Sequence, residues 1–304
     1  MKTAAPRTAI IPVAGLGTRL LPATKALPKG MLPLIDRPAV QYVVEEAAGA
    51  GLTDVVLVTG EDSDAFMAYF EPADRLERLL ADRGHHEVIA ELQASSELPV
   101  ASVRQAAPRG LGDAVLRCAE HVGAEPFAVL FGDNILSPGD DLMTKMIAAR
   151  KRYGGTILAL TEVAADETSA RCVAAFEATA DEGVVRVTDL VEKPDPSTAP
   201  SNWIMIGRCV CDPAIFDVLR ETPPGLGGEI QLSDALRTLA RADPAIGGGV
   251  HALLYRGRRF DTGNKQDYLR TTVELACSRP DLAGQFLPWL RHYVDTVIPS
   301  GAVR

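Results

Sequence analysis

The sequence has no run of apolar residues that approaches the roughly 20 needed to cross a bilayer as a helix. It also has no excess of positive charge, because 40 acidic residues outnumber 31 lysines and arginines and leave a formal net charge of -9. We therefore expect no general binding to nucleic acid or to membranes. The N-terminus does not match a signal peptide, since Pro12 and Gly15 interrupt its apolar run and no small-residue cleavage pattern follows.

Cysteine is scarce and dispersed. The five cysteines are odd in number and no CxxC spacing occurs, so we expect buried reduced thiols and a cytoplasmic protein. Cys209 and Cys211 are two residues apart in an apolar run and would share one face of a strand. The five histidines form no ligand cluster, and His85 and His86 fall in a charged helical stretch that predicts a solvated face.

Positive charge is concentrated near the N-terminus. Residues 1–38 hold six basic side chains and one acidic one, and much of this excess lies in AGLGTRLLPATKALPKGMLP, residues 14–33. The stretch lacks the spacing of a Walker A motif, and Leu20 stands where a dinucleotide-binding GxGxxG needs its third glycine. Its backbone N–H groups, followed by Arg19, Lys25 and Lys29, suit a triphosphate. The alternative is a Gly/Pro-rich surface loop with solvated bases.

Apolar strands alternate with amphipathic helices through the first 165 residues. Strands are expected over 8–14, 54–59, 99–104, 127–131 and 155–163, and helices over about 40–48, 113–121 and 140–152. This order predicts a largely parallel sheet covered on both faces. In such sheets ligands bind beyond the carboxyl ends of the strands, where the loops 14–33, 105–113 and 132–136 would meet.

The pattern changes after residue 165. Strands at 172–178, 184–194 and 202–211 with turns between them predict a more antiparallel insertion. Helices follow at 213–221 and 230–241, then a strand at 250–257 and a turn at 258–265. A helix over 266–277 and an amphipathic segment at 286–294 end the pattern. Phe286, Leu287 and Leu290 in this last segment would either contact a partner or dock onto the chain's own core.

Four further residues could bear chemistry. Asp133 ends a buried strand in LFGDN, and Asp261 lies in FDTGN, so the two could serve as Mg²⁺ ligands beside a triphosphate. Taken singly, each is more often a turn-forming aspartate. Glu192 and Lys193 in VEKP would point to opposite faces of an ideal strand, but Pro194 marks the strand's end, where a twist could bring both into one cavity. An exposed, ion-rich strand end is the equal alternative.

The motifs in this order resemble one family. GLGTRLLPATKALPKGMLPLIDRPAVQYVVEEA, VRQAAPRGLGDAV, FGDN, VEKP, APSNWIMIGR, TPPGLGGEIQLSDAL and RRFDTGN are similar to bacterial UTP–glucose-1-phosphate uridylyltransferases over about residues 8–294. The resemblance implies a single-domain α/β nucleotidyltransferase fold over 1–304, with a mixed, mostly parallel sheet, Rossmann-like wrapping and a small antiparallel insertion. Residues 8–165 would form the nucleotide-binding half, 166–265 the sugar-binding half and 266–304 the C-terminal helices.

The resemblance also implies a reaction and a set of roles. With Mg²⁺, a nucleoside triphosphate and a sugar 1-phosphate would give a nucleoside diphosphate sugar and pyrophosphate. The implied catalytic residues are Arg19, Lys29 and Lys193, and the metal ligands are Asp133 and Asp261. Nucleotide contacts would come from Ala14, Gly15, Gly17, Lys25, Gln105 and Gly110, with Gln105 reading the pyrimidine edge. Sugar contacts would come from Cys172, Glu192, Lys193 and Glu229. Family analogy suggests a homo-oligomer.

Some positions depart from the family pattern. Gly30 replaces a usual glutamate, Asp113 a usual histidine, and Arg171-Cys172 a usual Tyr-Gly pair, so that Cys172 is expected to narrow the sugar pocket. Three hypotheses follow: a UTP–glucose-1-phosphate uridylyltransferase, the same chemistry on another sugar or cyclitol 1-phosphate or with dTTP, and an inactive nucleotide-sugar-binding regulator. Restoring Gly30→Glu together with Cys172→Gly is expected to favour glucose 1-phosphate.

Overall fold

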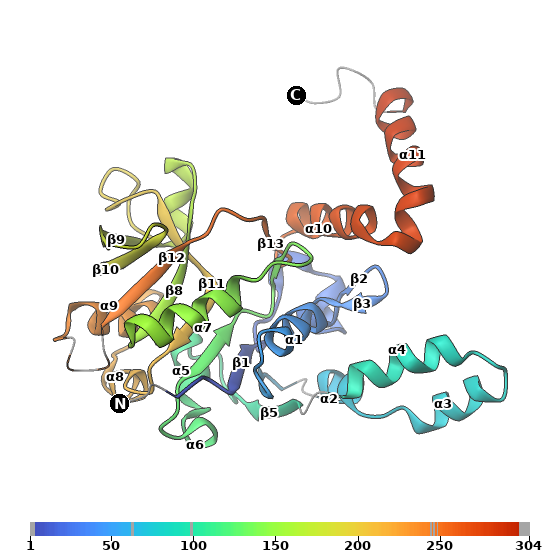
Figure 1. Cartoon of the computed structure of the whole chain (residues 1–304), viewed down its shortest axis with the longest axis horizontal. Coiled ribbons are helices and arrows are strands. Elements are labelled where there is room, and N and C mark those ends of the chain that lie inside the picture. The colour runs from blue at the N-terminus through green and yellow to red at the C-terminus, as the bar shows by residue number, and fades with distance from the viewer. Residues whose placement is uncertain are drawn as a thin grey trace.

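The strand β1 (Thr8–Pro12) lies in the middle of the parallel part of a nine-stranded sheet (Figure 1). The computed structural model describes residues 4–61, 64–97, 100–243, 245, 247 and 249–297. The sheet order is β5-β4-β1-β6-β11-β8-β12-β10-β9. The other strands are β4 (Asp54–Thr59), β5 (Val100–Arg104), β6 (Phe127–Leu130), β8 (Thr156–Glu162), β9 (Cys172–Ala178), β10 (Val184–Glu192), β11 (Trp203–Cys211) and β12 (Val250–Leu254).

The sheet is mixed, as predicted, with as many antiparallel as parallel neighbouring pairs. β5, β4, β1 and β6 are parallel neighbours, whereas β11 is antiparallel to both β6 and β8. β10 pairs antiparallel with β12 and with β9, which forms the antiparallel insertion. The predicted strands at 54–59 and 172–178 are confirmed in full, while residue 99 of the predicted 99–104 strand lies outside the described residues.

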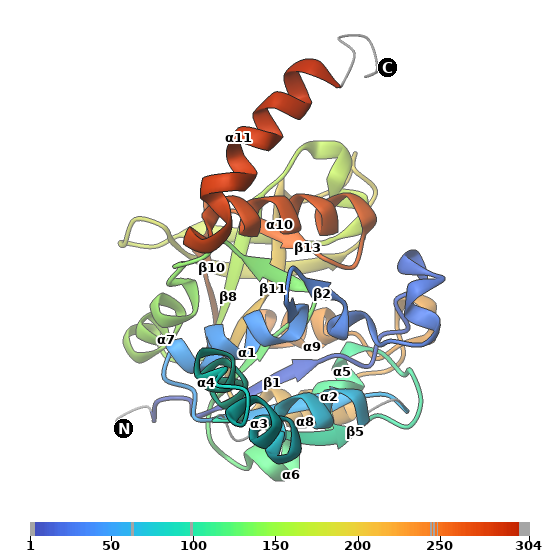
Figure 2. The ribbon, with the colours of Figure 1, turned by 90° about the vertical axis from the view of Figure 1, so that its right-hand side faces the viewer.

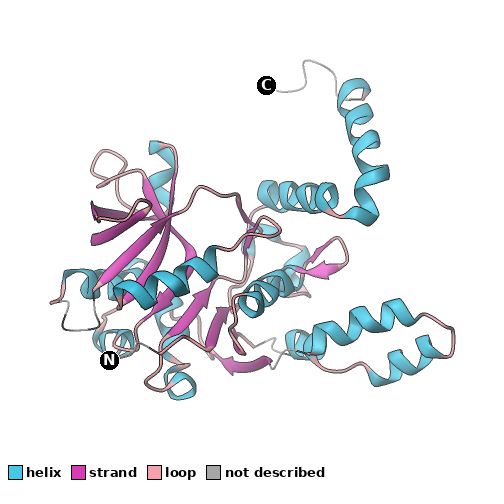
Figure 3. Ribbon diagram, viewed as in Figure 1, coloured by secondary structure: helices cyan, strands magenta, loops and turns pink. Residues whose placement is uncertain are grey.

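Helices cover both faces of the sheet (Figures 1 and 3). One core cluster joins Ile11, Val55 and Leu57 with α1 (Ala39–Gly49), α2 (Asp64–Phe70) and α7 (Leu142–Tyr153). The other joins the alternate residues Ile10, Val56 and Val58 with α5 (Leu111–Leu116), α6 (Ala119–Val122), α8 (Ile215–Glu221) and α9 (Leu232–Arg241). The two-residue period of the strands therefore assigns successive side chains to different helical layers.

Two segments project from this body (Figures 1 and 2). The helices α3 (Asp74–Ala81) and α4 (His86–Ser96) form a hairpin beyond α2, which the sequence pattern did not predict apart from the helical stretch at His85 and His86. After α10 (Lys265–Ser278), α11 (Pro280–Thr296) extends away from the sheet and has no buried described residue. The alternative in which the last amphipathic segment docks onto the chain's own core is therefore wrong.

Two smaller predictions are also corrected. The expected helix over 113–121 is two short helices, α5 and α6, with Arg117 and Cys118 between them. The expected turn over 258–265 includes a strand, β13 (Arg259–Asp261), which pairs antiparallel with β7 (Asn134–Leu136). The thiols of Cys118, Cys172, Cys209 and Cys211 are buried and free, as predicted. Among the described residues, none of the helices is long and apolar enough to span a membrane.

The buried side chain of Arg208 joins three parts of the fold. Its Nε and Nη2 donate to the two carboxylate oxygens of Glu46 on α1 at 2.7 and 2.6 Å. Nη2 also donates to the carbonyl of Asn134 at 2.7 Å, and Nη1 to that of Gly207 at 2.7 Å. Because Arg208 is only 1% exposed, this buried network ties together β11, α1 and the first residue of β7.

We expect Arg208→Met to lower the free energy of unfolding by about 3–5 kcal/mol, because it leaves the Glu46 carboxylate without its buried partner. Urea unfolding measures the loss. The control is Arg186→Met, which removes an exposed ion pair with Glu177 and should cost about 1 kcal/mol or less. Equal losses for the two variants would contradict this role of Arg208.

Candidate active site

Three loops meet at the carboxyl edge of the parallel strands. The segment after β1 contains the glycine-rich stretch, the segment after β5 begins with Gln105, and the turn after β6 contains Asp133. Since these strands run in the same direction, their following loops must emerge at the same edge. The predicted convergence of the loops 14–33, 105–113 and 132–136 is therefore confirmed.

The glycine-rich loop folds closely around the side chain of Lys29. Gly17 has a φ of +62°, and a Cβ there would lie 2.9 Å from Cβ of Lys29. A Cβ on Gly15 would lie 3.3 Å from Nζ of Lys29. Thr24 donates its hydroxyl proton to the Gly17 carbonyl at 2.9 Å and closes the loop. Only glycine combines this left-handed backbone with so close an approach.

The two candidate metal ligands are joined by the β7–β13 ribbon. Asp261 is opposite Asn134 in this antiparallel pair, and Asn134 directly follows Asp133. The N–H and hydroxyl of Thr262 donate to the Asp133 carbonyl at 2.8 and 3.0 Å. An ideal Cβ on Gly263 would lie 2.9 Å from Oδ1 of Asp261 and 3.0 Å from Oδ2 of Asp133, so both carboxylates border one point.

The Asp133 carboxylate is paired with Lys29. The distance from Lys29 Nζ to Asp133 Oδ2 is 2.5 Å, and Asn134 Nδ2 donates to Oδ1 at 3.0 Å. Burial by itself would raise the pKa of Asp133, but the ammonium of Lys29 and these hydrogen bonds outweigh it and hold the pKa below its ordinary value. Residues 104 positions apart in the sequence thus form the charged centre of the site.

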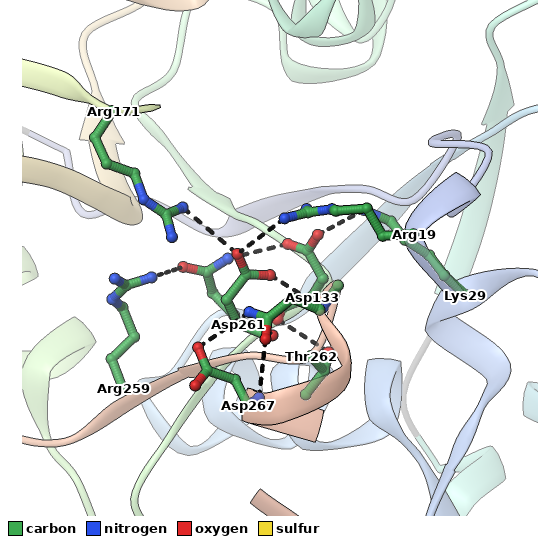
Figure 4. A network of polar contacts seen from close by, with 11 residues as sticks. Arg19, Lys29, Asp133, Arg171, Arg259, Asp261, Thr262 and Asp267 are labelled. Atoms are coloured by element: carbon green, nitrogen blue, oxygen red, sulfur yellow. Dashed lines mark hydrogen bonds and ion pairs between the residues drawn. The ribbon is translucent and has the colours of Figure 1, made fainter. Parts of the chain in front are cut away.

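Three guanidinium groups surround this centre (Figure 4). Arg19 lies 3.9 Å and Arg171 3.5 Å from Oδ2 of Asp261, and Arg259 donates to Oδ1 of Asn134 at 3.2 Å. Burial, and then the charge of Arg171, lower the pKa of Arg259. The positive side chains outnumber the two carboxylates, so the electrostatic potential of the site attracts further anions.

The carboxylate pair fits a hard divalent cation. Mg²⁺ binds oxygen ligands and usually takes one or two protein carboxylates, with phosphates and water completing its shell. Asp133 and Asp261 provide two such carboxylates at one point. In the described part of the chain, no group of three or more His, Cys, Asp or Glu side chains could hold a metal. A two-carboxylate site that shares its cation with phosphates remains consistent with the donor set.

Two cavities adjoin the loops. One of about 250 Å³ is lined by Lys29, Asp133, Gly110 and Glu229, among others. A second, of about 310 Å³, extends along Leu16, Gly60 and Phe66. Ala14, Gly15, Gln105 and Pro108 line both. Gly110 has a φ of +102°, and a Cβ there would lie 2.6 Å from the Ile230 carbonyl, which explains the glycine. A larger cavity of about 1100 Å³ beside α10 is lined by none of the predicted site residues.

The VEKP strand end turns its two charged residues together. Lys193 directly follows β10 and has a φ of +47°, and its Nζ lies 3.9 Å from Oε1 of Glu192. Ser233 on α9 donates to Oε2 of Glu192 at 2.8 Å. The backbone N–H of Lys193 donates to the carbonyl of Arg171 at 2.9 Å. The chain therefore turns at this strand end, as predicted, whereas the expectation that both side chains reach one cavity stays a prediction.

Three predicted residues are less closely involved. Lys25 is exposed on the short 3₁₀ segment Ala23–Lys25. Cys172 is 7% exposed and belongs to a hydrophobic core cluster. Glu229 is exposed beside Gly110, where it lines the 250 Å³ cavity. The roles proposed for these residues from the family resemblance stay predictions.

Arg171 and Arg259 were not predicted as site residues. Arg171 falls in the one pair of positions that departs from the family's Tyr-Gly, so the departure itself was the available signal. Arg259 is two residues before Asp261, and the alternation of β13 places both on one side of the ribbon. That signal was hidden because the segment was interpreted as a turn.

Gly30 is buried against α2. An ideal Cβ at this position would lie 3.1 Å from Cε1 of Phe66 and 3.7 Å from Cγ1 of Val13. We expect Gly30→Glu to lower the melting temperature, because the side chain must displace the ring or bury a carboxylate beside it.

Phe66→Ala in the Gly30→Glu background should recover part of the loss. A double-mutant cycle measures the coupling between positions 30 and 66. Strict additivity of the two changes would contradict the steric explanation. The glutamate at position 30 would then matter only for the predicted preference for glucose 1-phosphate.

The ion pair between Lys29 and Asp133 makes stability depend on pH. A carboxyl group with a lowered pKa stabilises the fold above its ordinary value of about 3.9, and this contribution is lost as the pH falls through the folded value. We expect Lys29→Met to raise the pKa of Asp133, because burial is then no longer offset. Carbon-13 NMR of the carboxyl measures it, with Lys25→Met as the control that should leave the pKa unchanged.

Comparisons with known proteins agree with this geometry. The profile of the family described as Nucleotidyl transferase matches residues 8–277. The UTP–glucose-1-phosphate uridylyltransferase YngB of Bacillus subtilis (strain 168) is 40% identical over 291 residues, which are 95% of this chain and 95% of the relative.

Two solved structures are also similar. A UDP-glucose pyrophosphorylase complexed with UDP-glucose matches with a TM-score of 0.80 and 36% identity over 90% of this chain and 100% of that chain. A UTP-bound UGPase from Acinetobacter baumannii matches with a TM-score of 0.86 and 33% identity over 94% of this chain and 99% of that chain. The chain therefore belongs to the nucleotidyl transferase family, among its UTP–glucose-1-phosphate uridylyltransferases.

Proposed function

We propose that this protein transfers the uridylyl group of UTP to glucose 1-phosphate in a Mg²⁺-dependent reaction that gives UDP-glucose and pyrophosphate. The observation that carries the proposal is the convergence of Lys29, Asp133 and Asp261 beside the glycine-rich loop. Relatives of similar length carry the uridylyltransferase name, and similar structures hold UTP or UDP-glucose.

The reaction needs no protein nucleophile. A phosphate oxygen of the sugar 1-phosphate attacks the α-phosphorus of UTP, the bond to the bridging oxygen breaks, and pyrophosphate leaves with the electron pair. The chain contributes alignment of two polyanions and stabilisation of the charge that develops on the leaving group. In our proposal Arg19 and Lys29 supply this positive charge, and the backbone of Ala14, Gly15 and Gly17 approaches the phosphates.

Asp133 and Asp261 are the proposed ligands of Mg²⁺. When bound, the cation would neutralise phosphate charge and favour departure of pyrophosphate. In this role of Asp133, Lys29 would exchange its carboxylate partner for a phosphate oxygen. The 2.5 Å contact between Lys29 and Asp133 places the ammonium where it can serve either group.

The remaining contacts are assigned to the base and to the acceptor. Gln105 and Gly110 are proposed to contact the uracil, with Lys25 as an outer cation near the phosphates. Lys193 would hold the phosphate of the acceptor and Glu192 its hydroxyl groups, with Cys172 and Glu229 on the sugar side. Residues 8–165 would then form the nucleotide half, 166–265 the sugar half and 266–304 the C-terminal helices; residues 1–3 and 298–304 lie outside the described residues.

One observation keeps an alternative acceptor open. Arg171 adds a guanidinium beside the residues proposed for the acceptor. Its backbone carbonyl accepts from the N–H of Lys193, and its side chain pairs with Asp261. Another sugar or cyclitol 1-phosphate, or dTTP as donor, would use the same chemistry. An inactive regulator is less favoured, because both carboxylates and the cations Arg19 and Lys29 are in place.

We expect a pyrophosphate-release assay of four nucleotides, UTP, dTTP, CTP and ATP, against several sugar 1-phosphates to give its highest kcat/KM for UTP with glucose 1-phosphate. A poor rank for that pair would overturn the proposed substrates but not the reaction type. Asp133→Asn should lower kcat/KM by at least about 100-fold, since it removes a charge that acts on the transition state. Unchanged release by this variant would overturn the catalytic assignment.

Location and assembly complete the proposal. The four buried free thiols support a cytoplasmic location. A homo-oligomer is supported by α11, on which the rings of Trp289 and Tyr293 stack at 5.3 Å while the side chains remain 52% and 39% exposed. Exposed aromatic surface of this kind is typical of a contact between chains.

A further inference from the structure

The amide of Gln105 is held in one orientation by acceptors. Its Nε2 donates to Oδ2 of Asp113 at 2.8 Å and to the carbonyl of Gly110 at 3.0 Å. A backbone carbonyl and a carboxylate paired with arginine can only accept, so the nitrogen and not the oxygen of the amide must face them. Both hydrogens of the Gln105 amide are thereby used within the protein.

Asp113 is itself firmly placed. It lies in the first turn of α5 with 7% exposure, and Nε and Nη2 of Arg117, one helical turn later, contact its two oxygens at 3.0 and 3.3 Å. Gln105 is 6% exposed, and its backbone N–H donates to the Thr59 carbonyl at 2.8 Å. The orientation of the amide is therefore set from both ends.

The other end of the amide faces the cavities. None of the described residues donates a hydrogen bond to Oε1 of Gln105, yet this oxygen is not one of the fully enclosed atoms that lack a partner. Gln105 lines both the 250 Å³ and the 310 Å³ cavity, together with Ala14 and Gly15. The site consequently presents a pure hydrogen-bond acceptor at this point.

We propose that Asp113 is a positioning residue that selects the nucleobase by fixing Gln105 with its Oε1 toward the ligand. A base is then accepted if it carries an N–H at the facing edge, as the imide N3–H of uracil does, and it is rejected if it carries a lone pair there, as N3 of cytosine does. This inference rests on the proposed function, since it takes the ligand to be a nucleoside triphosphate.

The same geometry limits what Gln105 can distinguish. Thymine has the same imide N3–H as uracil, so the acceptor at Oε1 treats the two alike. Discrimination between UTP and dTTP must come from contacts with the ribose 2′-hydroxyl or the 5-methyl position. An unmade hydrogen bond at a desolvated site costs about 10- to 100-fold in affinity, which sets the scale expected for cytosine.

The first experiment uses the unaltered protein. Equilibrium binding of UTP, CTP and 3-methyl-UTP, which lacks the N3–H, is measured by isothermal titration calorimetry. We expect CTP and 3-methyl-UTP to bind at least about 10-fold more weakly than UTP. If UTP binds and reacts but both analogues bind equally well, the inference fails while the proposed function stands. If UTP itself does not bind, the proposed function fails.

The second experiment replaces Asp113. In Asp113→Asn the side chain can donate as well as accept, so only the Gly110 carbonyl still favours the nitrogen on that side and the Gln105 amide can turn over. We expect the ratio of kcat/KM for UTP to that for CTP to fall at least about 10-fold, with KM for glucose 1-phosphate unchanged. An unchanged ratio in a folded variant, with or without an equal loss of kcat/KM for both nucleotides, would overturn the positioning role.

A matched control separates this role from a structural one. Away from the site, the Asp212 carboxylate lies 3.0 Å from the guanidinium of the buried Arg150. Asp212→Asn therefore also removes a carboxylate from a pair with arginine. This variant should lower the melting temperature and leave the UTP to CTP ratio within twofold of the unaltered protein. A changed ratio in Asp212→Asn would show that general destabilisation alters nucleotide choice, and it would count against Asp113.

Discussion

The guanidinium of Arg208 is the contact on which the arrangement of the site depends. It binds the carbonyl of Asn134, the first residue of β7 and the neighbour of Asp133, and it also holds the Glu46 carboxylate of α1. β7 pairs with β13, which ends at Asp261. A single buried cation thus fixes the position of both carboxylates. Its five donors suit this task, because each can satisfy a separate buried acceptor.

In the site itself, by contrast, the positive charges are only partly neutralised. Arg208 has its hydrogen bonds satisfied inside the protein, whereas Arg19 and Arg171 approach Asp261 only at 3.9 and 3.5 Å. Such loosely paired guanidinium groups keep donors available for phosphate oxygens. The same chain therefore uses arginine in two ways, as a fully bonded structural tie and as an under-bonded binding group. Burial and the number of acceptors within reach decide between them.

Much of the fold and part of the site could be predicted from the sequence. Alternating strands and helices gave the parallel edge and the convergence of the loops after β1, β5 and β6, because strand direction alone determines where loops emerge. The pairing of β7 with β13 could not be predicted, since both strands have three residues and their register depends on contacts 125 residues apart, such as that of Arg259 with Asn134. The hairpin α3–α4 escaped for another reason. Leu76, Leu79 and Leu80 recur at helical spacing in α3, but none of the hairpin's described residues is buried, so its helices are not part of the alternating core pattern.

The short contact between Lys29 and Asp133 has a consequence for the order of events at the site. In the protein without substrates the Asp133 carboxylate forms an ion pair with Lys29. A carboxylate neutralised in this way holds a free divalent cation only weakly. Under the proposed function, arrival of a triphosphate would draw the ammonium of Lys29 toward phosphate and uncover the negative charge of Asp133. Affinity for the cation would then be created by the nucleotide. Lysine and metal would exchange places as the counter-ion of one carboxylate.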